Sequence, residues 1–246
     1  MNVTNILIAQ PEPIGTTPYA ELIEKHKLIV DFVPFTRIES LSAKEFRAQR
    51  IDIQKHSAVV FTARTAVDMF FSLCEELRFT VPLTMKYFCM TESIANYLQK
   101  YIVYRKRKIF FGNGTIHSLI EVINIKHRQE IFLLALADNY KPEIPKAFDK
   151  ARLKNTKAVF YRTIINTEIK NIELKRYDMM VFYSPHEVKS LRENFPNFKQ
   201  GKTLMASFGV AAAKALKEND FKVAVEAPTP EAPSIAKALD IFLSGG

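Results

Sequence analysis

Short apolar runs alternate along this chain with longer stretches in which apolar and polar residues recur at helical spacing. The runs Asn5–Gln10 and Ser57–Thr62 are almost continuously apolar, as in strands that are buried on both faces of a sheet. The stretch Arg64–Leu77, which follows the second run, has the period of an amphipathic helix. Repeated along the chain, this alternation predicts an α/β fold with parallel sheets and helices on both faces.

The same pattern assigns elements to the whole chain. Strands are expected over Asn5–Gln10, Leu28–Phe35, Ser57–Thr62, Met85–Met90, Lys108–Gly112, Ile131–Ala137, Lys157–Ile164, Asp178–Tyr183, Thr203–Phe208 and Lys222–Glu226. Helices are expected from Thr17-Pro18 through Ile23, over Ser42–Arg50, Arg64–Leu77, Ser93–Tyr101, Ile116–Ile125, Glu143–Leu153, Ser184–Phe195 and Ala211–Asn219, and from Thr229-Pro230 to Gly245. Capping boxes and N-terminal prolines mark several of these helix starts.

An internal repeat links the two halves of the chain. The segment VFTARTAV at Val60–Val67 aligns with VFYSPHEV at Val181–Val188, and TESIANYL at Thr91–Leu98 aligns with GVAAAKAL at Gly209–Leu216. The period is as long as a domain, so the repeat indicates two lobes of common ancestry rather than a solenoid. The alternative is chance similarity between generic strand–helix units.

The halves hold unequal numbers of strands, which predicts a split lobe. Joining 1–36 to 165–246 completes a five-stranded sheet, and 41–157 then forms an inserted second lobe. The chain would cross between lobes at 35–40 and 158–164, as two connector strands that run side by side. This arrangement would put Tyr161, in the segment KAVFYRTI, at the mouth of a cleft. The plain alternative is an amphipathic strand residue with its hydroxyl in water.

Composition indicates a globular cytoplasmic protein. Of the 246 residues, 48% are hydrophobic and 25% are charged. No apolar run approaches the roughly 18–20 residues that span a bilayer, and the first residues lack the pattern of a signal peptide. Cys74 and Cys89 are the only cysteines and are expected to be reduced core residues. The five histidines show no metal-ligand spacing, so no metal is expected.

The formal net charge of +9 implies an anionic partner. The densest basic run, Arg105–Lys108, is expected to be a solvated linker before a strand. A nucleic-acid patch is disfavoured there because no aromatic platform accompanies the run. Only seven glycines occur and no glycine-rich nucleotide loop is present. Nucleic acid, an acidic membrane surface or a small polyanion would each satisfy the positive charge.

In its ordered motifs the chain resembles the uroporphyrinogen-III synthase family. The segments that carry the resemblance are VFTARTAVDMFF (60–71), AVFYRT (158–163), DMMVFYSPHEV (178–188), ASFGVAAAKAL (206–216) and APTPEAPSIAKAL (227–239). The resemblance implies two flavodoxin-like or Rossmann-like lobes, the first discontinuous, joined by a two-stranded connector. It implies a monomer that needs no cofactor or metal, and it leaves open a transient contact with hydroxymethylbilane synthase.

The resemblance also implies a reaction and a site. Hydroxymethylbilane, a linear tetrapyrrole with eight carboxylates, loses its terminal hydroxyl, and the macrocycle closes with inversion of the last ring through a spiro intermediate. The phenol of Tyr161 matches the family's candidate proton donor. Backbone N–H groups at three helix-opening corners would bind the carboxylates. The residues implied in binding are Thr62, Ala63, Arg64, Thr65, Ser184, Pro185, His186, Gly209, Val210, Ala211 and Ala212.

Several positions depart from the family pattern. Ala63 replaces a serine, Gln10 replaces an arginine, and Val210–Ala213 lacks the usual threonines. Glu187 puts an acid into a corner where substrate carboxylates are expected to dock. Each lost charged or hydroxyl contact is worth ~1–3 kcal/mol. A second hypothesis therefore stays open: a catalytically impaired homologue that binds an anionic small molecule between two lobes.

Overall fold

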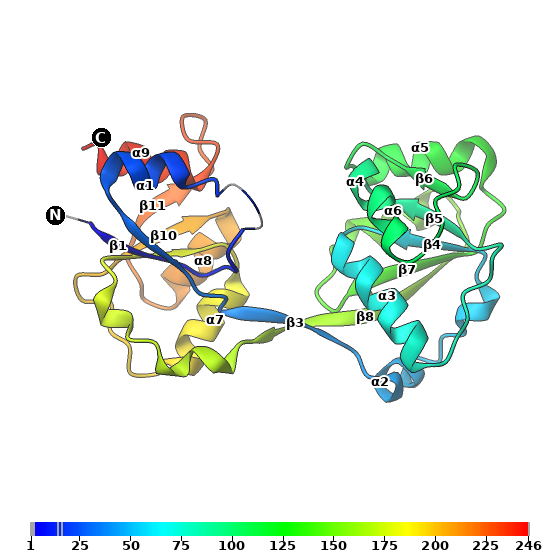
Figure 1. The fold of residues 1–246 in the computed structure, drawn as a ribbon, viewed down its shortest axis with the longest axis horizontal. Coiled ribbons are helices and arrows are strands. Elements are labelled where there is room, and N and C mark those ends of the chain that lie inside the picture. Colours follow the sequence, from blue (N-terminus) through cyan, green and yellow to red (C-terminus); the bar gives the residue numbers. More distant parts are fainter. Residues whose placement is uncertain (1–2, 14, 16, 246) are drawn as a thin grey trace. The chain divides into compact units, whose positions relative to one another are not determined.

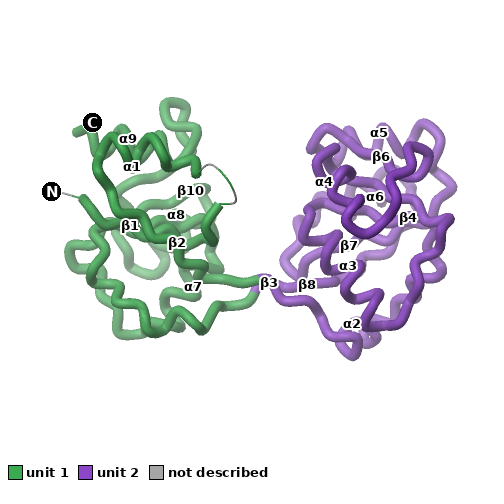
Figure 2. The backbone as a smooth tube through the Cα atoms, viewed as in Figure 1, with its two compact units in different colours: residues 1–37, 164–246 green, residues 38–163 purple. Residues whose placement is uncertain are grey.

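The computed structural model describes residues 3–13, 15 and 17–245. The chain forms two compact units, one from Met1–Arg37 with Ile164–Gly246 and the other from Ile38–Thr163, which are coloured separately in Figure 2. Each unit contains a mainly parallel sheet with helices packed on it. The predicted fold class, two α/β lobes of which the first is discontinuous, is confirmed.

Unit 1, Met1–Arg37 with Ile164–Gly246, contains a five-stranded sheet in the order β11-β10-β9-β1-β2, and all neighbouring strands are parallel (Figure 1). Its strands are β1 (Asn5–Ile8), β2 (Ile29–Phe32), β9 (Met179–Phe182), β10 (Leu204–Phe208) and β11 (Val223–Ala227). Its helices are α1 (Ala20–His26), α7 (Pro185–Asn194), α8 (Val210–Glu218) and α9 (Ile235–Leu243), with the short 3₁₀ helices η3 (Thr167–Asn171) and η4 (Leu174–Arg176).

Unit 2, Ile38–Thr163, holds most of a six-stranded sheet in the order β3-β8-β7-β4-β5-β6. Its strands are β3 (Thr36–Ser40), β4 (Ala58–Phe61), β5 (Lys86–Cys89), β6 (Ile109–Phe111), β7 (Phe132–Ala137) and β8 (Asn155–Ile165). Its helices are α2 (Ala43–Ala48), α3 (Arg64–Glu76), α4 (Glu92–Tyr97), α5 (Ile116–Lys126) and α6 (Glu143–Lys150), with the 3₁₀ helices η1 (Ile53–Lys55) and η2 (Leu98–Lys100).

The two sheets have the same spatial order once the edge strand β3 is set aside. In unit 1 the neighbours β11-β10-β9-β1-β2 correspond to β6-β5-β4-β7-β8 in unit 2. The strands β9 and β10, whose corners repeat those of β4 and β5 in the sequence, occupy the matching places. The segments that repeat in the sequence therefore occupy matching positions in the two sheets, and the β4–α3 and β9–α7 corners are equivalent.

Strand residues alternate between two cores in each unit. In β1, Ile6 and Ile8 lie in the core on one face, whereas Leu7 lies in the core on the other face. In β4, Val59 lies in the core on one face of the sheet and Ala58 lies in the core on the other face. All five of these residues are buried. Because helices cover both faces of each sheet, side chains on both sides of a strand are buried, and the strand sequence is therefore continuously apolar.

The strands β3 and β8 are neighbours and both pass from one unit to the other. In unit 2 the backbone N–H of Leu41 donates to the carbonyl of Phe160 at 2.9 Å. In unit 1 the N–H of Asn166 donates to the carbonyl of Phe35 at 3.0 Å. The two strands therefore run in opposite directions, because Leu41, just after β3, pairs with Phe160 within β8, whereas Phe35, just before β3, pairs with Asn166, just after β8.

Two predicted helix starts are wrong. The first helix begins at Ala20. Thr17 lies in the turn before this helix, where its side chain accepts from the N–H of Tyr19 and its carbonyl accepts from the N–H of Ala20. The last helix begins at Ile235 after its N-cap Ser234, whereas Thr229 closes a turn with Ala232. In both places a Thr-Pro pair serves a turn, which has the same local hydrogen-bond chemistry as a helix cap. Within the described residues, no helix is both long enough and apolar enough to cross a membrane.

Candidate functional site

In open α/β sheets, ligands bind beyond the carboxyl ends of the strands. They bind at the topological switch point, where connections from two adjacent strands lead to opposite sides of the sheet. That position lies between β1 and β9 in unit 1 and between β4 and β7 in unit 2. The corners that follow β4 and β9 open α3 and α7, and the corner after the neighbouring strand β10 opens α8. The residues implied by the family resemblance thus lie at the carboxyl edge of one sheet or the other.

The corner Thr62–Thr65 leaves the start of α3 without a side-chain cap. The N-cap residue is Ala63, with the extended backbone of a cap (φ −150°, ψ 160°) but no side-chain acceptor. The first-turn N–H groups of the helix therefore lack the partner that Ser, Thr or Asp would supply. The neighbouring Arg64 donates to the hydroxyl of Ser93 at 2.5 Å and lies over the ring of Tyr97.

The corner Gly209–Ala212 leaves the start of α8 in the same condition. Its N-cap is Gly209, at φ 95°, and no side chain caps the helix. The next residue, Val210, is 85% exposed. A positive φ is inexpensive only for glycine, which accounts for the residue at this corner. Both α3 and α8 thus present open N-termini, which attract anions through backbone N–H groups and the helix dipole.

The corner Ser184–Glu187 differs because the chain fills it with its own carboxylate. Glu187 is only 3% exposed. Its Oε2 accepts from the backbone N–H of Tyr183 at 2.6 Å and of Ser184 at 3.3 Å, and its Oε1 accepts from Gln10 Nε2 at 3.1 Å. Ser184 completes the capping box. The corner therefore offers a substrate fewer backbone donors than the sequence predicts.

Burial governs the chemistry of this closed corner. Desolvation raises the pKa of Glu187, although the hydrogen bonds from Tyr183, Gln10 and Ser184 act in the opposite direction. The hydroxyls of Tyr19 and Tyr183 pair with each other nearby, and desolvation raises the pKa of both phenols. Pro185 occupies the first turn of α7, and His186 beside it is half-buried.

Tyr161 lies in β8 at a register irregularity opposite Leu136 and Ala137. Its side chain is 7% exposed and its ring belongs to a core of unit 2. The phenol makes no hydrogen bond to any residue that the structure describes. Burial raises the pKa of the Tyr161 phenol above the usual value of 10.0, and the nearby negative charge of Asp138 raises it further. The phenol is therefore protonated at neutral pH, with its proton not committed to a neighbour.

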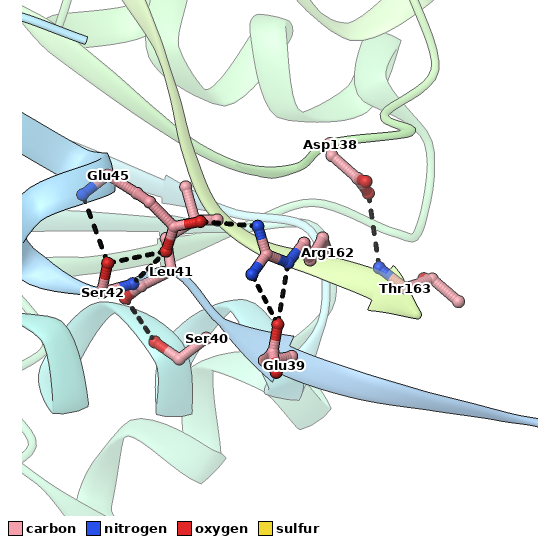
Figure 3. Close-up of polar contacts among 8 residues, drawn as sticks. All are labelled: Glu39, Ser40, Leu41, Ser42, Glu45, Asp138, Arg162 and Thr163. Carbon is pink, nitrogen blue, oxygen red and sulfur yellow. Dashed lines mark hydrogen bonds and ion pairs between the residues drawn. The ribbon is translucent and has the colours of Figure 1, made fainter. Parts of the chain in front are cut away.

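Arg162, the next residue, ties β8 to β3 and α2 (Figure 3). Its guanidinium contacts Glu39 Oε2 at 2.7 Å and Glu45 Oε1 at 2.7 Å. The other oxygen of Glu45 accepts from the hydroxyl of Ser42 at 2.7 Å and from its backbone N–H at 2.9 Å. The hydrogen bonds from Ser42 have the largest effect and the bond from Arg162 the next largest, and together they lower the pKa of Glu45 to about 2. The network holds the strand that carries Tyr161.

Local signals in the sequence could reveal only part of this site. The capping boxes Ser42–Glu45 and Ser184–Glu187 are predicted and are confirmed. The Gln10–Glu187 and Arg162–Glu39 contacts were missed, because each joins residues far apart in the chain. Among residues 3–13, 15 and 17–245, no three His, Cys, Asp or Glu side chains form a group that could hold a metal ion.

Comparison with known proteins gives a consistent answer. Residues 17–237 match the family described as uroporphyrinogen-III synthase HemD. The fold is similar to that of uroporphyrinogen-III synthetase from Helicobacter pylori, with a TM-score of 0.59 and 16% identity over 98% of this chain and 99% of that chain. It is also similar to a mutant uroporphyrinogen III synthase from Thermus thermophilus, with a TM-score of 0.51 and 19% identity over 97% of each chain. A search of curated proteins finds no match.

Replacing Glu45 by Gln should remove a pH-dependent part of the stability. The folded pKa of about 2 lies below the usual 4.5, so ionised Glu45 stabilises the fold above about pH 4.5, and this stabilisation is lost as the pH falls towards about 2. The variant should therefore be less stable than the parent at neutral pH, with a gap that closes in acid. Urea unfolding of both proteins across this pH range measures the gap. Glu24→Gln, which removes an exposed carboxylate without an ion pair in the described part of the chain, is the control variant. A gap for Glu45→Gln that is independent of pH would contradict the expectation.

Proposed function

Because this chain belongs to the uroporphyrinogen-III synthase family, we propose that it retains the family's activity as a lyase of tetrapyrrole biosynthesis. The reaction cyclises hydroxymethylbilane with inversion of ring D. The match spans residues 17–237, which is nearly the whole chain, and the fold is that of the family's solved members. The structural likeness supports the fold, whereas the proposal of activity depends on the family and on the chemistry of the corners.

The observation that carries the proposal is the pair of open helix starts at α3 and α8. Each is at the carboxyl edge of its own sheet, and neither has a side-chain cap. A substrate with eight carboxylates can use backbone N–H groups for recognition without any particular side chain. Replacement of hydroxyl residues by Ala63, Ala211 and Ala212 therefore leaves the main anion donors in place. The net charge of +9 favours the same substrate over a distance.

In this proposal Tyr161 acts as the general acid. Its phenol donates a proton to the terminal hydroxyl of hydroxymethylbilane, the C–O bond breaks, and water leaves. The cationic carbon is then captured by ring D, and the macrocycle closes through the spiro intermediate. The proton released when the last pyrrole regains its aromaticity returns to the phenolate. The raised pKa of Tyr161 keeps the acid loaded at neutral pH, and Arg162 holds its strand through Glu39 and Glu45.

The competing hypothesis is a catalytically impaired binder of an anionic small molecule. The closed corner at Glu187 is the observation that favours it, since one of three docking corners is filled by the chain itself. The comparisons lend no support to a separate binding function. Product analysis separates the two hypotheses, because a binder leaves hydroxymethylbilane to cyclise spontaneously.

The direct experiment supplies the purified protein with hydroxymethylbilane generated in situ and separates the products by chromatography. The type III isomer should predominate and should increase with protein concentration. A mixture that contains only the type I isomer, formed at the spontaneous rate, would refute the proposed activity. Saturable binding of the substrate in that same case would establish the binder instead.

Tyr161→Phe should reduce turnover by about 10²-fold or more, the usual range for loss of a general acid. Its stability should change little, because the ring stays in the core and the lost hydroxyl has no described hydrogen-bond partner. Initial rates and urea unfolding test both parts. Tyr140→Phe, in the same unit, is the matched control and should keep full activity. Unchanged turnover in Tyr161→Phe would remove this residue from the mechanism.

Ala63→Asp should stabilise the protein and weaken substrate binding. An N-cap carboxylate would accept from the open N–H groups of α3, as the Ser184 hydroxyl accepts from the N–H of Glu187 at α7, and would contribute about 0.5–2 kcal/mol to folding. It would also repel substrate carboxylates and raise KM by about tenfold. Ala63→Asn is the matched control, since it caps without charge and should raise KM less. An unchanged KM in the Asp variant would exclude the α3 start as a docking point.

A further inference from the structure

A pocket of about 470 Å³ lies in unit 2, away from the corners described above. Its wall is formed by the end of α3, the loop before β5 and the segment between η2 and β6. The strands β5 and β6 are parallel. Residues that precede both strands line the pocket, so it opens at the amino edge of the sheet. The candidate active-site corners lie at the carboxyl edge, and the proposed cyclisation leaves this pocket without a role.

The wall of the pocket is mostly apolar. Phe71 and Tyr101 stack with ring centroids 4.5 Å apart and an interplanar angle of 6°. Leu83 and Val103, also on the wall, are 83% and 79% exposed. Two large apolar side chains that face water beside a cavity indicate a surface completed by an apolar ligand. The volume is within the range of small-molecule sites, about 300–1,000 Å³.

The polar groups of the wall favour a negative ligand. Arg105 and Lys108 both line the pocket, and neither forms an ion pair with a carboxylate in the described part of the chain. They are the two ends of the basic run Arg105–Lys108. Among the described residues that line the pocket, Glu75 is the one carboxylate. Burial raises the pKa of the lining thiol of Cys74 to about 12, so this group adds no negative charge at neutral pH.

We infer that this pocket binds a small amphipathic anion. The apolar body of the ligand lies against Phe71, Tyr101 and the loop residue Leu83, and its single carboxylate or sulfonate pairs with Arg105 and Lys108. An ammonium in place of the acid would meet two cations and one carboxylate, and a neutral ligand would leave both cations unpaired. The inference concerns a second site and does not depend on the proposed cyclisation.

Binding of 8-anilinonaphthalene-1-sulfonate, which has an aromatic body and one sulfonate, tests the inference by fluorescence titration. Arg105→Gln/Lys108→Gln should weaken binding about tenfold, through loss of charge-assisted hydrogen bonds. Lys106→Gln/Arg107→Gln changes the net charge equally within the same run but alters no lining residue, and should shift binding less than twofold. Equal losses in the two double variants would show a general charge effect and overturn the inference.

Two further measurements locate the ligand. The chain has no tryptophan, so Phe79→Trp places a single donor in the pocket wall, and its emission should be quenched as the dye binds. Dodecanoate should displace the dye, whereas dodecanol and dodecyltrimethylammonium should compete at least tenfold less well. Absent quenching, or displacement by the neutral or cationic chain at the concentration at which dodecanoate acts, would overturn the inference. Circular dichroism confirms that each variant is folded.

Discussion

The constraint on which this architecture depends is the split of unit 1 between the two ends of the chain. Its sheet pairs β1 with both β2 and β9, and every residue of unit 2 lies in the sequence between β1 and β9. The chain therefore leaves along β3 and returns along β8, and these strands pair with each other. Arg162, with Glu39 and Glu45, ties the pair to α2 by charge-assisted hydrogen bonds. The proposed acid, Tyr161, is adjacent to this tie.

The three helix-opening corners show how one backbone geometry serves two purposes. A helix start carries unsatisfied N–H groups whatever its sequence. At α7 the Ser184 hydroxyl accepts from the N–H of Glu187, and the Glu187 carboxylate accepts from the N–H groups of Tyr183 and Ser184 just before the helix. These bonds stabilise the corner and close it. At α3 and α8 the chain supplies no side-chain acceptor, and the donors are left for an anion. The departures from the family pattern thus differ in effect. Loss of a hydroxyl leaves the backbone donors of a corner open, whereas the acid at Glu187 occupies the N–H groups of Tyr183 and Ser184.

Much of the fold was predictable because its signals are local. Apolar runs such as Ala58–Phe61 identify buried strands, and the boxes at Ser42 and Ser184 identify helix starts within a few residues. The errors at Thr17 and Thr229 have a local cause as well, because a threonine hydroxyl can close a turn as readily as it caps a helix. The candidate site was predictable as three corners with a capping box at Ser184–Glu187, whereas the contacts of these corners with distant residues such as Gln10 were not.

Periodicity and the order of motifs along the chain were enough to predict most strands and helices, the α/β class, the split lobe and the resemblance to the family. The contacts between distant segments emerge only from the tertiary structure. The pairing of Gln10 with Glu187 and of Arg162 with Glu39 joins residues more than a hundred positions apart, and no local pattern encodes a contact of that range. Burial, which raises the pKa of Tyr161 and keeps its proton in place, likewise arises only when distant segments pack together.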